Sequence, residues 1–137
     1  MIVYRELSSL EQDLGINAKT LYAVSNNLGK HYHKAKLPKK SGGYRNLSVP
    51  DDVLKSIQRQ IADVLLIHIP VSRYAKAYRF GSSTFRNAKH HVGKQVVLKL
   101  DILHFFDSIR YSTVKDKVFP EKIYAEPLRI LLSMLCY

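Results

Sequence analysis

The sequence is poor in cysteine and in long apolar runs. Its single cysteine, Cys136, excludes an intrachain disulfide and a zinc site built from several cysteines. No apolar run reaches the roughly 18 residues that a membrane-spanning helix needs, and the mixed residues 1–5 are not typical of a signal peptide. We therefore expect a cytoplasmic protein that has no membrane partner.

Acidic residues are half as frequent as basic ones. The 137 residues include 22 Lys and Arg against 11 Asp and Glu, which gives a net charge of +11. A positive excess of this size is typical of proteins that bind nucleic acid. Because 46% of the residues are hydrophobic, the chain can also bury a core. Composition thus favours one globular domain over a disordered chain and excludes collagen-like and coiled-coil classes.

Local patterns predict an α+β fold. A capping box at residues 8–11 and a stop at Gly15 predict a first helix, and a second begins at Asn17 with Leu21, Val24 and Leu28 on one face. Together they form a short helical lead-in over residues 1–30. A DNA-binding helix-turn-helix regulator over residues 8–28 is an alternative, but it leaves the later motifs unexplained.

A basic β-hairpin is predicted next. Two alternating runs, at residues 33–40 and 44–49, are joined by a Gly-containing turn at residues 41–43. Lys39, Lys40 and Arg45 flank this turn. Ammonium and guanidinium groups at a hairpin tip can grip a triphosphate or backbone phosphates, although a solvated turn carries such residues too.

Helices are also predicted on both sides of a polar middle segment. One runs from Asp51-Asp52 to about His68, and two more cover residues 112–118 and 126–137. The apolar positions of the first of these helices are Val53, Ile57, Ile61, Val64 and Leu65. The apolar end of the chain, residues 128–137, is interpreted as an open interface for further protein.

The middle segment, residues 71–94, is polar, basic and irregular. It interleaves basic, aromatic and amide groups at residues 78–83 and 86–91, as binders of single-stranded nucleic acid do. His90-His91 is a poor zinc pair, because adjacent side chains diverge and no third ligand is near.

Asp101 is the strongest single candidate for a metal-binding residue. It follows residues 95–100, which are predicted to form a buried strand, and it precedes Phe105-Phe106. Carboxylates at strand ends commonly hold Mg²⁺. From spacing alone, a helix cap or a satisfied carboxylate at a strand end remains open as the alternative.

Three ordered motifs resemble bacterial reverse transcriptases. Residues 37–45, LPKKSGGYR, with Val49-Pro50, Leu54-Lys55 and Gln58, are similar to the fingers of these enzymes. Residues 100–109, LDILHFFDSI, resemble their first palm motif. Between them lie Phe80-Gly81, Ser83, Asn87-Ala88 and His91. The Asn-Ala-x-x-His motif in this segment resembles that of retron-type enzymes. The resemblance covers residues 7–137.

This resemblance implies a right-hand polymerase. Residues 31–94 would be the fingers and residues 95–137 the first part of an incomplete palm. The implied activity is RNA-directed DNA synthesis on a structured non-coding RNA, with two Mg²⁺ ions, in phage defence. The implied partners are the RNA template, the DNA product, dNTP, the remaining palm and thumb, and a retron effector protein.

The resemblance also assigns roles to residues. Asp101 matches the catalytic, metal-binding aspartate, and the carbonyl of Ile102 its helper. Phe106 matches the steric gate that rejects ribose. The matched nucleotide-binding residues are Lys39, Lys40, Arg45, His104, Phe105 and Phe106. The matched nucleic-acid-binding residues are Lys36, Leu47, Arg79, Ser83, Asn87 and His91.

One departure from the family pattern is large. No Asp-Asp pair follows Asp52, so the Tyr-x-Asp-Asp turn of these enzymes is missing. Because one carboxylate cannot hold two Mg²⁺ ions tightly, we expect this chain alone to be inactive and to be part of a longer or split enzyme. The alternatives are a non-catalytic basic RNA-binding module, and a group II intron or other defence-associated reverse transcriptase.

Overall fold

The computed structural model describes residues 4–79 and 81–137. Phe80, which belongs to one of the three motifs, lies outside the described residues. The chain divides into two compact units, Met1–His68 with Ile109–Tyr137, and Ile69–Ser108. Each unit is described by itself.

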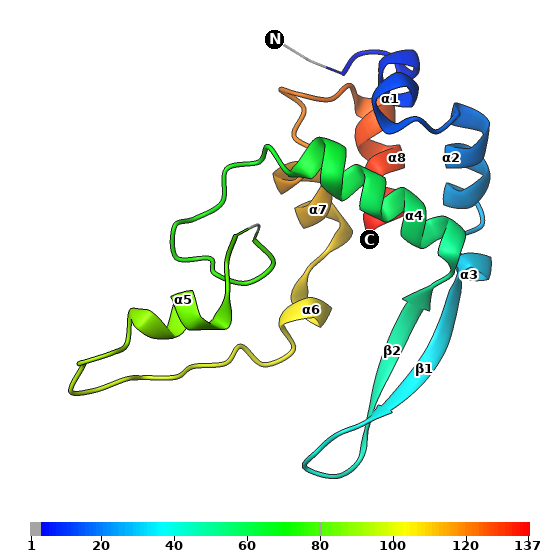
Figure 1. The fold of residues 1–137 in the computed structure, drawn as a ribbon. Helices are drawn as coiled ribbons and strands as arrows, with labels where there is room; N and C mark the ends of the chain where they lie inside the picture. The colour runs from blue at the N-terminus through cyan, green and yellow to red at the C-terminus, as the bar shows by residue number, and fades with distance from the viewer. Residues whose placement is uncertain (1–3, 80) are drawn as a thin grey trace. The chain divides into compact units, whose positions relative to one another are not determined.

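The first unit is a helical cluster that carries a β-hairpin (Figure 1). Its elements are α1 (Leu7–Leu14), α2 (Ala18–Ser25), α3 (Leu28–His31), β1 (Tyr32–Pro38), β2 (Tyr44–Pro50), α4 (Asp52–Gln60), the π-helix η1 (Ile61–Leu66), α7 (Tyr111–Lys117) and α8 (Glu126–Cys136). The second unit contains α5 (Thr84–Lys89) and α6 (Phe105–Ser108). The predicted α+β composition is confirmed.

Side-chain and glycine caps set the ends of the first helices. Gly15 ends α1 in the left-handed conformation, with φ of 64°. The Asn17 side chain accepts a hydrogen bond from the Thr20 amide at 2.8 Å and begins α2. The predicted capping box is wrong in detail, because α1 begins at Leu7 without a side-chain cap. Glu11 instead accepts a hydrogen bond from the Ala18 amide.

The core of the first unit is built around α8, which contacts α2, α4 and α7. Leu128, Leu131, Leu132 and Leu135 are at most 2% exposed. The prediction that this end of the chain is an open interface is therefore wrong for these leucines. The apolar faces of α2 and α4 need a common partner to leave water, and α8 supplies it, while α1 packs on α2 and η1. Ile130 and Met134 alone among its larger apolar residues are exposed, at 44% and 38%.

The helix after Pro50 is confirmed, with one change of face. Leu54, rather than the predicted Val53, is buried, and Val53 is 49% exposed. Ile57, Ile61 and Leu65 line the same buried side. The last turns adopt π-helical hydrogen bonding, which the apolar spacing gave no reason to expect.

The hairpin is antiparallel, as predicted, and its base is tied to α4 and α8. The Asp51 carboxylate accepts a hydrogen bond from the Leu54 amide at 2.9 Å and contacts His31 Nδ1 at 2.7 Å. These two interactions lower the pKa of Asp51, the Leu54 amide having the larger effect. The Gln58 amide nitrogen donates to Tyr32 Oη and to the Leu135 carbonyl, each at 2.9 Å.

The second unit departs most from the sequence expectations. Residues 95–100 are not a strand, and Val96, Leu98 and Leu100 are 77–83% exposed. A strand exists only when another strand satisfies its backbone groups, and the described part of this unit offers none. The region predicted to be irregular instead contains α5, where Ser83 Oγ accepts a hydrogen bond from the Arg86 amide at 3.2 Å.

Within residues 4–79 and 81–137, no helix is long and apolar enough to cross a membrane.

Candidate nucleotide and nucleic-acid interface

The hairpin tip is closed by two backbone hydrogen bonds. The Lys39 amide donates to the Gly43 carbonyl at 3.0 Å, and the Gly42 amide donates to the Lys39 carbonyl at 3.1 Å. Gly42 and Gly43 have φ of 88° and 78°, a conformation that side chains with a Cβ rarely adopt. The two glycines thus let the chain reverse and bring the residues before and after the turn together.

A basic pocket of about 370 Å³ lies at this tip. It is lined by Leu37, Pro38, Lys39, Lys40, Ser41 and Arg45. Leu37 is the strand partner of Arg45, and both residues line the pocket together with the two lysines. The structure therefore brings together the three cations that the sequence singled out. Both lysines line the pocket, so the geometry does not choose between them.

The rest of the hairpin separates the other two predicted contacts. Lys36 pairs with Asn46, and Leu47 pairs with Ala35, so Lys36 and Leu47 lie on opposite faces. Lys34, on the face of Lys36, donates a hydrogen bond to Ser48 Oγ at 2.7 Å. Lys36 is exposed and Leu47 is half-buried.

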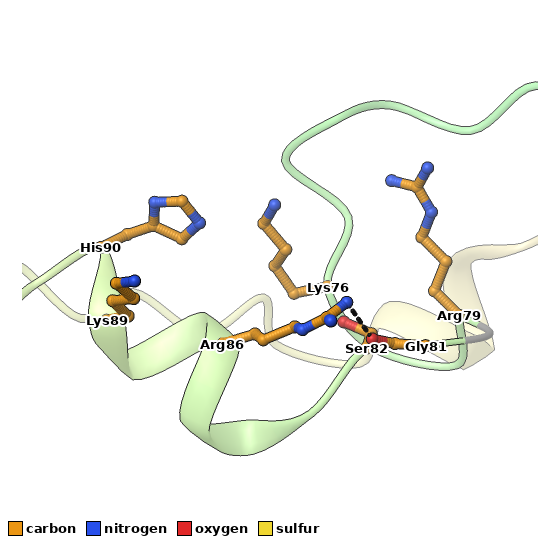
Figure 2. A pocket seen from close by; sticks show the side chains of 7 residues that line it. All are labelled: Lys76, Arg79, Gly81, Ser82, Arg86, Lys89 and His90. Atoms are coloured by element: carbon orange, nitrogen blue, oxygen red, sulfur yellow. Dashed lines mark hydrogen bonds between the residues drawn. The ribbon is translucent and has the colours of Figure 1, made fainter.

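The second unit contains a basic pocket of about 310 Å³, shown in Figure 2. It is lined by Lys76, Arg79, Gly81, Ser82, Arg86, Lys89 and His90. Arg86 Nη1 donates a hydrogen bond to the Gly81 carbonyl at 2.6 Å, drawn as a dashed line. Of the predicted nucleic-acid contacts, only Arg79 lines this pocket. Ser83 lies at the start of α5, where its hydroxyl caps the helix.

A neighbouring pocket of about 460 Å³ contains two further predicted residues, Asn87 and His91. Its other lining residues are Arg73, Tyr74, Lys76 and His90. Tyr74, Lys76 and Lys89 were not predicted as site residues from the sequence. The signal that could have found them is the absence of acidic residues around them, which a count along the chain reveals.

Asp101 lies on an exposed, irregular segment. It does not end a buried strand, so the predicted setting for this carboxylate is wrong in this structure. Ile102 beside it is 69% exposed. The following helix α6 begins with the paired rings of Phe105 and Phe106, whose centroids are 5.2 Å apart in an edge-to-face arrangement.

His104 and Asp107 frame these rings. His104 has a positive φ of 51°, and its Nδ1 lies 3.1 Å from Asp107 Oδ2. Phe106 is 78% exposed and Phe105 is 48% exposed. The segment therefore presents Phe106 to solvent and to any ligand.

The described residues do not complete a site for Mg²⁺. No group of three or more His, Cys, Asp or Glu side chains gathers anywhere in them. Asp101 and Ile102 offer one carboxylate and one carbonyl, whereas Mg²⁺ takes roughly six oxygen ligands. Two later acids are engaged by Arg129, whose guanidinium lies 2.8 Å from Asp116 and 2.7 Å from Glu126.

Arg129 itself is a buried link between α7 and α8. It is 7% exposed, and its Nε donates to the Phe119 carbonyl at 2.7 Å. Lys115 also contacts Glu126, and this contact contributes most to lowering the pKa of that carboxyl. These charges hold the helices together, so they are structural rather than metal-binding.

Comparison with known proteins places these features in a family. No family model matches the chain. The chain is 41% identical over 106 residues to the Retron Mx65 reverse transcriptase of Myxococcus xanthus. The matched residues cover 77% of this chain and 25% of that protein. The chain is 32% identical over 108 residues to the Retron Ec83 reverse transcriptase of Escherichia coli, covering 78% and 35%.

A third relative agrees with these two. The Retron Mx162 reverse transcriptase of Myxococcus xanthus is 34% identical over 85 residues, covering 62% of this chain and 18% of that protein. The chain thus spans about a fifth to a third of the length of the curated relatives it matches. Over most of its own length, this chain is thus homologous to a fragment of the retron-type reverse transcriptases.

Proposed function

We propose that this chain provides the nucleotide-binding and template-binding part of an RNA-directed DNA polymerase. The observation that supports the proposal most is the basic pocket at the hairpin tip, in a chain homologous to retron reverse transcriptases. In this proposal, residues 31–94 are the fingers and residues 95–137 contribute the first part of the palm.

The hairpin pocket suits a triphosphate. Lys39, Lys40 and Arg45 supply three positive charges, and the guanidinium can bind two phosphate oxygens at once. The apolar side chains of Leu37 and Pro38 line the same pocket and offer no side-chain acceptor that would compete with the anion for the three cations. We assign Lys39, Lys40 and Arg45 to the triphosphate of the incoming dNTP.

The segment around Asp101 would supply chemistry and sugar selection. Asp101 and the Ile102 carbonyl would contribute ligands to Mg²⁺, which in such enzymes aligns the attacking hydroxyl and neutralises the phosphates. Phe106 would exclude the ribose 2′-hydroxyl, with His104 and Phe105 beside it. Since the described residues lack the other ligands, we expect the 137-residue chain alone to be inactive.

The wider reaction is proposed from the relatives. The template would be a structured RNA that is copied into DNA, in a phage-defence system with an effector protein. Lys36, Leu47, Arg79, Ser83, Asn87 and His91 would contact nucleic acid, Ser83 through the α5 helix that it caps.

The test is primer extension by the protein that the intact gene encodes, on a poly(A) template with Mg²⁺ and dTTP. Arg45→Ala is expected to raise the KM for dTTP because it removes a phosphate contact. Lys34→Ala removes the same charge from the same hairpin, outside the pocket, and should leave KM unchanged. An unaltered KM in Arg45→Ala would contradict the assignment.

A second candidate is a non-catalytic RNA-binding module. The observation that favours it is that the described residues gather no group of three or more His, Cys, Asp or Glu side chains, at Asp101 or elsewhere, in a chain with a net charge of +11. Tight RNA binding by the intact gene product without any dTTP incorporation would select this candidate over the polymerase.

A further inference from the structure

Residues 64–100 contain no Asp or Glu. The same stretch contains Arg73, Lys76, Arg79, Arg86, Lys89, Lys94 and Lys99. None of these takes part in a salt bridge among the described residues. Positive charges that lack internal partners repel one another, and a bound anion relieves that repulsion. The charge pattern therefore predicts an anionic ligand for the second unit.

Two adjacent pockets in this unit offer different kinds of contact to a ligand. The basic pocket, defined above by its seven lining residues, shares Lys76 and His90 with the pocket that holds Tyr74, Asn87 and His91. We call the second one the tyrosine pocket. Lys76 is half-buried, whereas the six other Lys and Arg residues of the stretch are exposed. Lys76 thus lies where the two pockets join.

The basic pocket is held in shape by contacts within the unit. Ser83 caps α5, and this cap fixes the first turn of the helix that carries Arg86. Arg86 then donates to the Gly81 carbonyl, while the Ser82 amide closes a turn on the Arg79 carbonyl at 3.0 Å. Figure 2 shows Lys76, Arg86 and His90 extending toward the same space. Because one N–H of Arg86 is engaged, about four remain for an anion.

The tyrosine pocket offers an aromatic surface. Tyr74 is 75% exposed, and the guanidinium of Arg73 lies 4.8 Å from its ring centre. Arg73 Nη2 also donates to Tyr74 Oη at 2.6 Å, which holds the ring in place. Exposed rings beside cations stack nucleobases in single-strand binders. Asn87 adds an amide that can both donate to and accept from a base edge.

We infer that the two pockets together bind one nucleotide of a single-stranded polynucleotide, with its phosphate in the basic pocket and its base on Tyr74. A duplex does not fit this arrangement, because its bases are stacked on each other and closed to Tyr74. The identity of the strand as an RNA template rests on the proposed function. The phosphate and base contacts do not rest on the proposed function, because they are inferred from the pockets alone.

The test uses the 137-residue chain and a fluorescently labelled, unstructured RNA of about 12 nucleotides, within the usual footprint of such binders. Fluorescence anisotropy measures the dissociation constant from low to high salt. Tyr74→Ala is expected to weaken binding about fivefold to 140-fold, the range that one base stack represents. Tyr74→Phe keeps the ring but loses the hydrogen bond from Arg73, so it should weaken binding less than Tyr74→Ala.

Charge variants test the phosphate contact. Lys76→Ala should weaken binding and reduce the slope of log K against log salt by about 0.7, as expected for one lost phosphate on a single strand. Lys94→Ala is the matched control, since it removes the same charge from the same stretch but lines neither pocket. It should leave the salt slope unchanged. Circular dichroism of each variant confirms that the helices are retained.

Two results would overturn the inference: Lys94→Ala weakens binding as much as Lys76→Ala, or Tyr74→Phe loses as much affinity as Tyr74→Ala. DNA of the same sequence serves as a parallel probe, and the ratio of the two dissociation constants identifies the strand. Primer extension is scored separately. If DNA synthesis fails but RNA binding still depends on the two pockets, only the polymerase proposal is wrong. If DNA synthesis succeeds but RNA binding does not depend on the pockets, only the present inference is wrong.

Discussion

Leu132→Ala tests whether α8 is the centre of the core. Leu132 is fully buried, and its apolar neighbours come from several helices of the first unit. Removing three carbons costs about 2.4 kcal/mol in transfer free energy, and a residual cavity of about 50 Å³ adds about 1.2 kcal/mol. We therefore expect the free energy of unfolding to fall by about 3.6 kcal/mol.

Urea unfolding followed by circular dichroism measures this loss. With an m value of about 1.5 kcal/mol/M, the midpoint should fall by about 2.4 M. Ile130→Ala is the matched control on the same helix, because Ile130 is 44% exposed, and it should cost less than about 1 kcal/mol. Equal, small effects of both substitutions would refute the reasoning and restore α8 as an open face.

Three further predictions concern pH, thiol reactivity and sugar selection. Hydrogen bonds lower the pKa of Asp51 in the folded chain, so this carboxylate stabilises the fold above its unfolded pKa, and the effect is lost as pH falls through its folded pKa. Urea midpoints should therefore fall more between pH 6 and pH 3 in the wild type than in Asp51→Asn, whose amide oxygen still caps Leu54. Burial raises the pKa of Cys136 to about 12, so iodoacetamide at pH 8 should alkylate it only in urea, and rapid labelling of the folded chain would contradict this. Phe106→Ala should let the intact gene product incorporate ribonucleotides in primer extension, and unchanged sugar selectivity would remove Phe106 as the gate.

Local chemistry made much of the first unit predictable. Gly15, Asn17 and Asp51 each act on neighbouring backbone groups within about one turn, so the sequence around them predicts the helix ends. Gly42 and Gly43 likewise predict the hairpin turn. The lysines and Arg45 were found for the same reason, since the turn alone brings them together.

Features that depend on distant partners were less predictable. Whether the leucines of α8 face water or protein depends on α2 and α4, which lie far away in the sequence. Residues 95–100 have the composition of a strand, but composition cannot supply a hydrogen-bonding neighbour. The helix α5 was missed although Ser83 is a good capping residue, because its six residues contain little apolar periodicity.

The same distinction applies to the candidate sites. Cations in one turn could be grouped from sequence, whereas the meeting of Lys76 with His90 depends on the folded path of residues 69–108. The carboxylates of Asp116 and Glu126 are a second case that depends on the fold. Their role follows only from the buried Arg129, which contacts both.

The most direct test of the central claim is DNA synthesis by the intact gene product and its Asp101→Asn variant, measured as incorporation from dTTP on primed poly(A) with Mg²⁺. Asp107→Asn is the matched control, because Asp107 lies in the same segment and contacts His104. We predict incorporation by the wild type and by Asp107→Asn, and none by a folded Asp101→Asn. Undiminished synthesis by Asp101→Asn, or none by the wild type, would contradict the assignment of this chain to a working reverse transcriptase.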